Sequence, residues 1–271
     1  MINYCIRIQY DGTRYKGWQV QKNEENTIQG KLQNVLSRLM GMPVEVIGSG
    51  RTDAGVHAKG QVANFHLDEV LLRRKLDPEG KLSLEGRKLD DYLLFMLNTW
   101  LPEDIGVDRI DRRPERFHAR YQAVSKTYRY RIDTGRSHTV FDRKYVYSYT
   151  DAELDPVLMK KAADNLLGTH DFTSFCGNSH MKKSAVRTLY SIEIEQVSDR
   201  ETDLVFTGDG FLMNMVRILA GTLIEVGTGR RDPDSMADLL AAKDRSQAGY
   251  TAPAQGLVLD QVKYPDSCRP L

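Results

Sequence analysis

Two hydrophobic periods alternate along the first half of the chain. Apolar and polar residues alternate in the manner of strands at 3–9, 44–47, 62–67 and 107–110. Between the first two, apolar residues recur at helical spacing from Thr27 to Met40, and Gly41 with Pro43 ends that pattern. A weaker helical pattern covers residues 90–99. The predicted order is therefore β-α-β-β-α-β.

The second half of the chain repeats this order. It predicts strands at 126–132, 187–196, 203–207 and 257–262, and helices at 156–167, 211–226 and 233–243. Two successive β-α-β-β-α-β runs predict an α+β protein with two tandem ferredoxin-like halves, each an antiparallel sheet with helices on one face. The join lies near Pro114, which gives an N-terminal half of residues 1–112 and a C-terminal half of residues 113–271.

Composition narrows the class of protein. The 271 residues include 38 basic and 37 acidic side chains, so a case for nucleic-acid binding must rest on local patches. Cys5, Cys176 and Cys268 are far apart, which predicts neither a disulfide framework nor a zinc cluster. The N-terminus runs straight into a strand pattern, and the most apolar stretch, 211–226, is too short and too polar to span a bilayer. We expect a soluble cytoplasmic protein without a membrane partner.

A glycine-rich loop, GSGRTDAGVH at residues 48–57, lies between two strand patterns. Gly50 and Gly55 have the spacing that opens a phosphate-binding loop, but the Lys-Ser/Thr pair of such a loop is missing. Asp53 is the candidate reactive group, because a carboxylate acts as nucleophile, base or metal ligand. The alternative is an aspartate that accepts backbone amides in a tight turn. His57 lacks further metal ligands at useful spacing, so we expect a structural role for it and no metal site.

Two further residues invite a chemical interpretation. Arg217 stands in GFLMNMVRILAG, where nearly every neighbour is apolar. A buried guanidinium needs an anionic partner, either a protein carboxylate or a substrate phosphate, unless the side chain extends to the surface. Cys176 follows His170 and Asp171 and so invites a Cys–His–Asp triad, but a small buried thiol is the better interpretation.

Basic and aromatic residues interleave in RRPERFHARY and in SKTYRYRID. On a strand, Tyr128 and Tyr130 share one face, while Arg129 and Arg131 point to the other. Aromatic rings stack on bases and arginines bind phosphates, so this mixture is typical of RNA binding. The alternative is that these tyrosines simply pack in the core.

Taken together, these motifs resemble tRNA pseudouridine synthases of the TruA family. The matching stretches are YDGTRYKGWQVQ, GRTDAGVHAKGQV, FHARYQAVSKTYRYRI, GTHDFTSF, FLMNMVRILAGTLIEVG, LLAAKDR and APAQGLVL, in the family's order. By this resemblance, Asp53 is the catalytic aspartate and Arg51 displaces the target base. Tyr128 stacks on the target uracil, and Arg217 pairs with the catalytic carboxylate.

The resemblance also implies the fold, the reaction and the partners. The family fold has two related halves that form a cleft, and its members work as homodimers on the anticodon stem-loop of tRNA, at uridines near positions 38 to 40. Uridine becomes pseudouridine without any redox cofactor, nucleotide or metal. The charged segment 73–88 departs from the family pattern, since it is longer than the usual connection. Two alternatives remain: a non-catalytic RNA-binding module, although the RNP1 pattern is absent, and an Asp/His hydrolase.

Overall fold

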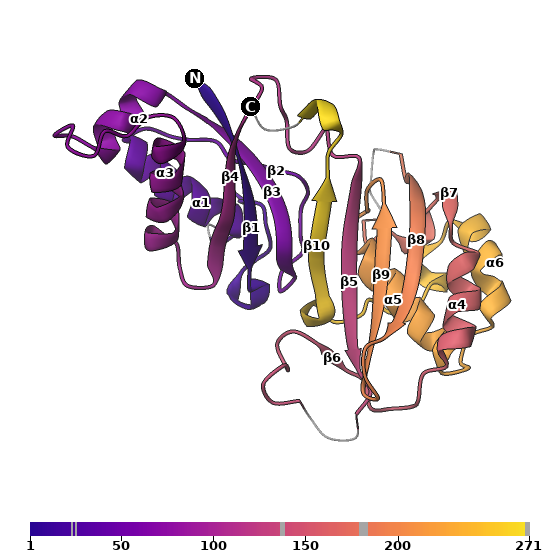
Figure 1. Ribbon diagram of the computed structural model, residues 1–271. Helices are drawn as coiled ribbons and strands as arrows, with labels where there is room; N and C mark the ends of the chain where they lie inside the picture. The colour runs from indigo at the N-terminus through magenta and orange to yellow at the C-terminus, as the bar shows by residue number, and fades with distance from the viewer. Residues whose placement is uncertain (23, 25, 136–138, 179–183, 269–271) are drawn as a thin grey trace. The chain divides into compact units, whose positions relative to one another are not determined.

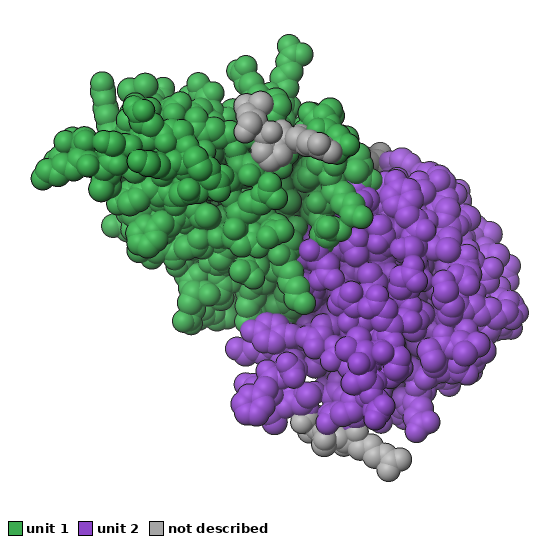
Figure 2. Space-filling view, viewed as in Figure 1, with its two compact units in different colours: residues 1–124, 261–271 green, residues 125–260 purple. Residues whose placement is uncertain are grey.

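The computed structural model describes residues 1–22, 24, 26–135, 139–178 and 184–268. The chain divides into two compact units (Figure 2). Unit 1 comprises residues 1–124 together with the C-terminal stretch from residue 261, and unit 2 comprises residues 125–260. Unit 1 is therefore assembled from both ends of the chain.

Unit 1 is an antiparallel sheet with three helices (Figure 1). Its elements are β1 (Ile2–Tyr10), α1 (Ile28–Met40), β2 (Ile47–Gly48), β3 (His57–Leu67), α2 (Glu69–Leu76), α3 (Arg87–Trp100) and β4 (Ile105–Arg113). β1 lies between β4 and β3, and β2 pairs with β3. This is the expected β-α-β-β-α-β order with α2 inserted. The join expected at residues 112 and 113 falls within β4.

The local sequence explains why these elements form. Thr27 is the N-cap of α1, where its hydroxyl accepts a hydrogen bond from the Gly30 amide at 3.1 Å, and Gly41 ends the helix at φ +72°. Alternate residues of β1 from Tyr4 to Tyr10 are buried and form one face of the sheet. The Tyr4 hydroxyl bonds to Asp90 of α3 at 3.1 Å, so this face packs under that helix. The predicted helix and first strand are confirmed.

Several boundaries in unit 1 differ from the prediction, and one helix was not predicted. The strand expected at 44–47 is reduced to β2, and the strand expected at 62–67 begins earlier, at His57. The first residues of β3 do not alternate between apolar and polar, because buried polar groups such as Gln61 occur there. The sequence pattern did not predict α2. It lies partly within the charged segment and is short, with Asp68 as its N-cap.

Unit 2 has the same kind of architecture. Its elements are β5 (Ser125–Asp133), β6 (Tyr147–Ser148), α4 (Pro156–Asp164), β7 (Gly168–Asp171), β8 (Val186–Gln196), β9 (Glu201–Gly208), α5 (Met215–Gly227), α6 (Met236–Ala242) and β10 (Leu257–Lys263), whose last residues enter unit 1. β9 pairs antiparallel with β5 and β8, and β8 pairs antiparallel with β7. The expected α+β class of tandem ferredoxin-like halves is confirmed.

The helix α5 starts four residues later than predicted. Asn214 precedes it with φ +58°, in the left-handed region, so residues 211–214 cannot continue the helix toward the N-terminus. From Met215 onward the helix is buried on most sides, as its apolar sequence predicts. α5 contacts α4 and the strand β5, and it carries Arg217 in its first turn.

Candidate functional site

The glycine-rich loop of unit 1 is held by the segment that follows β1. The Trp18 amide donates to the Thr52 carbonyl at 3.0 Å, and the Gly55 amide donates to the Tyr15 carbonyl at 3.3 Å. Within the loop, the Val56 amide donates to the Asp53 carbonyl at 3.2 Å. Asp53 is half-buried in this frame. These bonds fix the backbone that carries its carboxylate.

Two glycines allow this close contact between segments. A Cβ atom on Gly12 would lie 2.0 Å from the Val56 carbonyl oxygen. A Cβ atom on Gly17 would lie 2.6 Å from the Thr52 carbonyl oxygen, and Gly17 also has φ +90°. Any larger residue at these positions pushes the loop away from its support. The glycines of YDGTRYKG are therefore needed to place Asp53.

Buried polar side chains anchor the loop on both sides of Asp53. The hydroxyls of Tyr10 and Thr52 are hydrogen-bonded at 2.8 Å, and burial raises the pKa of Tyr10 well above its ordinary value. On the other side, the Ser49 hydroxyl donates to the Gln61 side chain at 2.6 Å, and Gln61 donates to the Gly50 carbonyl at 3.0 Å. The loop is thus preorganised in the folded protein.

His57 contributes to the same support. Its ring is 3% exposed, and its Nδ1 accepts a hydrogen bond from the Gly12 amide at 3.1 Å. The same nitrogen lies 3.2 Å from a carboxylate oxygen of Asp11. The geometry fits the structural hydrogen-bonding role that we expected of His57.

In unit 2, Tyr128 lies on β5 with its ring packed in an edge-to-face arrangement against Phe211. The two ring centroids are 5.1 Å apart at an interplanar angle of 81°. The Tyr128 side chain is only 6% exposed. Its position on a central strand and this aromatic contact restrict the motion of its ring.

Arg217 is positioned by a loop as well as by its own helix. Its Nε donates to the Ala252 carbonyl at 2.7 Å, and one terminal nitrogen donates to the Asn214 side chain at 3.2 Å. The Ala252 amide in turn donates to the Arg217 carbonyl at 3.1 Å. This loop packs tightly on α5, because a Cβ atom on Gly221 would lie 2.0 Å from the Tyr250 carbonyl oxygen. The half-buried guanidinium is therefore oriented by a backbone carbonyl and an asparagine side chain.

The sequence-predicted site residues are divided between the two units. Arg51, which is exposed, and Asp53 belong to unit 1, whereas Tyr128 and Arg217 belong to unit 2. Sequence reasoning missed the residues that support the loop, above all Tyr10 and Gln61. The mixture of aromatic residues and glycines in QYDGTRYKGW is a signal for Tyr10, whereas the sequence has no such signal for Gln61.

The arginines of TYRYR do not support the RNA-binding interpretation of their strand. Arg129 binds carboxylates of Glu195, Asp203 and Asp260 at 2.6 to 2.9 Å. Arg131 similarly binds a carboxylate of Glu201 at 2.6 Å. These ion pairs occupy guanidinium donors that phosphates would need. The prediction that the two arginines share one face is confirmed, but that face is an ion-pair network within unit 2.

Among the described residues, no cluster of three or more His, Cys, Asp or Glu side chains is arranged to hold a metal ion. The described helices also include none with the length and apolar character needed to cross a bilayer.

Comparison with known proteins gives one consistent family. A family model described as tRNA pseudouridine synthase matches residues 6–122 and 162–265. A protein of Bacillus sp. (strain KSM-64), named tRNA pseudouridine synthase A, is 45% identical over 97% of this chain and 100% of its own length. Proteins of Bacillus cereus and Brevibacillus brevis with related names are 42% and 41% identical, over 97% and 96% of this chain and 100% and 98% of their own lengths.

Proposed function

Since this chain belongs to the tRNA pseudouridine synthase family, we propose that Asp53 is the catalytic group with which it isomerises uridine in the anticodon stem-loop of tRNA. The observation that carries this assignment is the way the Asp53 backbone is held. Hydrogen bonds at Thr52 and Gly55, and the close approach of Gly17, fix a half-buried carboxylate in a rigid loop. A carboxylate fixed in this way suits a nucleophile or base better than a surface aspartate does.

The reaction explains why a single carboxylate is sufficient. The glycosidic bond between N1 and C1′ breaks, and a bond between C5 and C1′ forms. C5 loses its proton and N1 gains one, so atoms balance and nothing is oxidised or reduced. The base must be detached, turned and joined again while it is outside the helical stack, and extrusion costs a few kcal/mol.

The other site residues would bind the extruded nucleotide and fill the space that its base leaves. We assign Arg51, which is exposed beside Asp53, to the space that the base leaves and to the adjacent phosphate. Tyr128 offers an aromatic ring for stacking, which contributes about 1–3 kcal/mol per base. Asp53 and Tyr128 belong to different units, so both units would contribute residues to the reaction. The proposal also includes the expected homodimer and the cytoplasmic location.

Arg217 would pair with the Asp53 carboxylate and keep it charged and correctly oriented. The Ala252 carbonyl and the Asn214 side chain fix the guanidinium, whose planar fork matches a carboxylate in a bidentate contact. Such a pair lets a half-buried carboxylate stay ionised at neutral pH. The proposed pair links one predicted residue of each unit.

Replacing Arg217 tests this pairing. Arg217→Lys keeps the charge but loses the fork, so kcat should fall about 10- to 100-fold, the equivalent of one or two charge-assisted hydrogen bonds. Arg217→Ala should also move the acid limb of the pH–rate profile to higher pH, because no cation then favours the charged carboxylate. Normal turnover of Arg217→Lys would contradict the pairing. Thermal unfolding of both variants controls for loss of the Ala252 contact.

The proposed activity is tested directly by hydrogen release. The protein is incubated with a tRNA transcript that carries tritium at C5 of uridine, without any added cofactor. Pseudouridine formation replaces the C5–tritium bond by a C5–carbon bond, so tritium should appear in the solvent. A transcript with cytidine in place of the anticodon stem-loop uridines is the matched control and should release none. Equal release from both transcripts would contradict the anticodon stem-loop assignment.

A further inference from the structure

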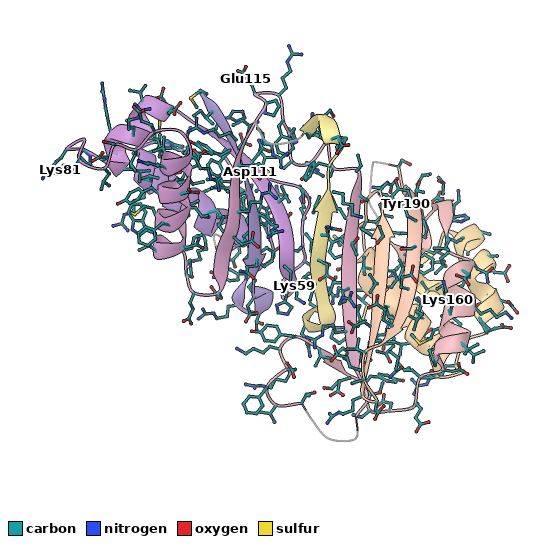
Figure 3. The ribbon with its side chains drawn as sticks, viewed as in Figure 1. Lys59, Lys81, Asp111, Glu115, Lys160 and Tyr190 are labelled. Atoms are coloured by element: carbon teal, nitrogen blue, oxygen red, sulfur yellow. The ribbon has the colours of Figure 1, made fainter. Side chains whose placement is uncertain are left out.

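The basic and aromatic stretch RRPERFHARY forms a surface that the proposed active site does not use. Residues 114–122 fold into two successive turns after β4. In the sheet of unit 1, Asn3 pairs with Arg113 at one end of β1, and Tyr10 pairs with Ala58 at the other. Seven residue steps along a strand correspond to about 23 Å. The two-turn segment and the Asp53 loop therefore lie at opposite ends of this sheet, as Glu115 and Lys59 show in Figure 3.

The two-turn segment is rigid because buried amides hold its backbone. The Asn3 side chain donates to the carbonyls of Pro114 and Phe117 at 3.2 and 2.8 Å. The Asn64 side chain accepts from the Ala119 amide at 2.9 Å. Phe117 and Ala119 are themselves buried, at 3% and 0% exposure. The segment is thus attached to the sheet at Pro114, Phe117 and Ala119, while Arg116 and Arg120 remain exposed.

The exposed side chains of the segment include Glu115, two arginines and a tyrosine. Arg116 and Arg120 are exposed, and Tyr121 is 77% exposed. His118 Nδ1 accepts hydrogen bonds from the amides of Arg120 and Tyr121 at 3.1 and 3.3 Å, which fixes the second turn. The rings of His118 and Tyr121 lie 4.2 Å apart at 33°, so one side of the tyrosine is supported and the rest is open to solvent.

The surface carries positive charges on Arg116 and Arg120 and one negative charge on the exposed Glu115. In the described part of the chain, neither Arg116 nor Arg120 forms an ion pair. Nearby Arg112, by contrast, binds Asp90 and Glu69 at 2.9 and 3.3 Å. Guanidinium groups without carboxylate partners bind phosphate oxygens without first losing an internal contact. An exposed tyrosine beside them offers a face on which a base stacks.

We propose that Arg116, Arg120 and Tyr121 form a second RNA contact, which binds the tRNA substrate at a distance from the reacting uridine. The two arginines bind backbone phosphates, and Tyr121 stacks on an unpaired or terminal base. The contact anchors the substrate while the Asp53 loop acts elsewhere on it. This inference rests on the proposed function only in that tRNA is the ligand.

The arginines are tested by the salt dependence of tRNA binding. For the double variant Arg116→Ala/Arg120→Ala, the affinity for an unmodified tRNA transcript should fall about tenfold. The slope of log Kd against log salt should fall by about 1.5 to 2, one phosphate contact for each arginine. The matched control is Arg74→Ala/Lys75→Ala, which removes the same charge from exposed positions of α2. The control should leave the slope unchanged.

Two variants test whether Tyr121 stacks on a base. Tyr121→Ala should weaken tRNA binding at least about fivefold, because base stacking on an aromatic side chain is worth about 1 kcal/mol or more. Tyr121→Phe keeps the aromatic face and should bind like the unaltered protein. In the double arginine variant, in Tyr121→Ala and in Tyr121→Phe, the rate of tritium release at saturating tRNA should be unchanged, since none of these residues touches the reacting base.

Three results would overturn the proposal. Unchanged affinity and salt slope in the double arginine variant would show that the surface serves another partner, such as a protein. Equal losses in the α2 control would show an effect of net charge alone. Equal losses in Tyr121→Ala and Tyr121→Phe would exclude stacking. The proposed function fails separately, if the unaltered protein releases no tritium from a tRNA that it binds.

Discussion

Asp53→Asn is expected to reduce tritium release from uridine-labelled tRNA by about 10³-fold or more while tRNA binding is retained. An amide has nearly the shape of the carboxylate but acts neither as nucleophile nor as base, and loss of such a group typically costs several orders of magnitude in rate. The backbone bonds that hold the loop, at Thr52 and Gly55, do not involve the side chain. The fold of the loop should therefore survive the substitution.

The Asp53→Asn variant also distinguishes an enzyme from a protein that only binds RNA. Asp238→Asn is the matched control, because Asp238 is an exposed carboxylate of α6 far along the chain from the loop. It should leave both turnover and binding unchanged. If Asp53→Asn released tritium at the normal rate, the catalytic assignment would be wrong. If the unaltered protein bound tRNA and neither protein released tritium, a binding module would be the better description.

Gly17→Ala is expected to have the second largest effect, although Gly17 takes no part in the chemistry. Its φ of +90° is strained for any residue with a Cβ atom, which costs about 1–3 kcal/mol in the free energy of unfolding. The new Cβ would also lie 2.6 Å from the Thr52 carbonyl oxygen, so the loop must move. A displacement of about 1 Å at a catalytic group costs on the order of 100-fold in rate.

Gly80→Ala distinguishes these two effects. Gly80 has a similar φ of +67°, but nothing lies within 4 Å of the position of its Cβ. It should lower the melting temperature through backbone strain and leave turnover unchanged. Both variants are compared by thermal unfolding and by tritium release at a temperature at which each is folded. Normal turnover of Gly17→Ala would show that the loop tolerates displacement.

Sequence periodicity predicted most of the fold because alternate residues are buried in strands such as β1 and β5, and apolar residues recur at helical spacing in α1. β5 and β9 extend only a residue or two beyond their predicted bounds. The strand β7 was missed since its sequence, GTHD, is short and has no buried apolar residue. Tertiary pairing with β8, through Gly168 opposite Leu189 and its neighbours, makes it a strand. Short edge strands of this kind depend on partners that a local pattern does not contain.

The sequence identified the candidate site residues, but it did not predict the contacts that hold them in place. The motif containing Asp53 was evident, whereas its attachment to Gly12 and Gly17 depends on backbone carbonyls more than thirty positions away. Likewise, alternation placed Arg129 on one face of its strand, but its acidic partners come from three other strands. A periodic pattern predicts the face of the strand on which a side chain lies, but it does not predict the residues that the side chain contacts.

The return of the C-terminal stretch to unit 1 has a consequence for synthesis on the ribosome. Cys268 packs with Cys5, Phe117 and their neighbours, and the Tyr264 hydroxyl donates to the Ala119 carbonyl at 2.6 Å. These contacts cannot form until residues 261–268 have left the exit tunnel. Residues 1–124 therefore cannot complete their packing while unit 2 is translated. During that time their apolar patch is uncovered, and unit 2 is free to fold. Most of unit 1 is translated before unit 2, but unit 1 completes its folding only after unit 2 has been translated. Its uncovered apolar patch is exposed to chaperones during that interval.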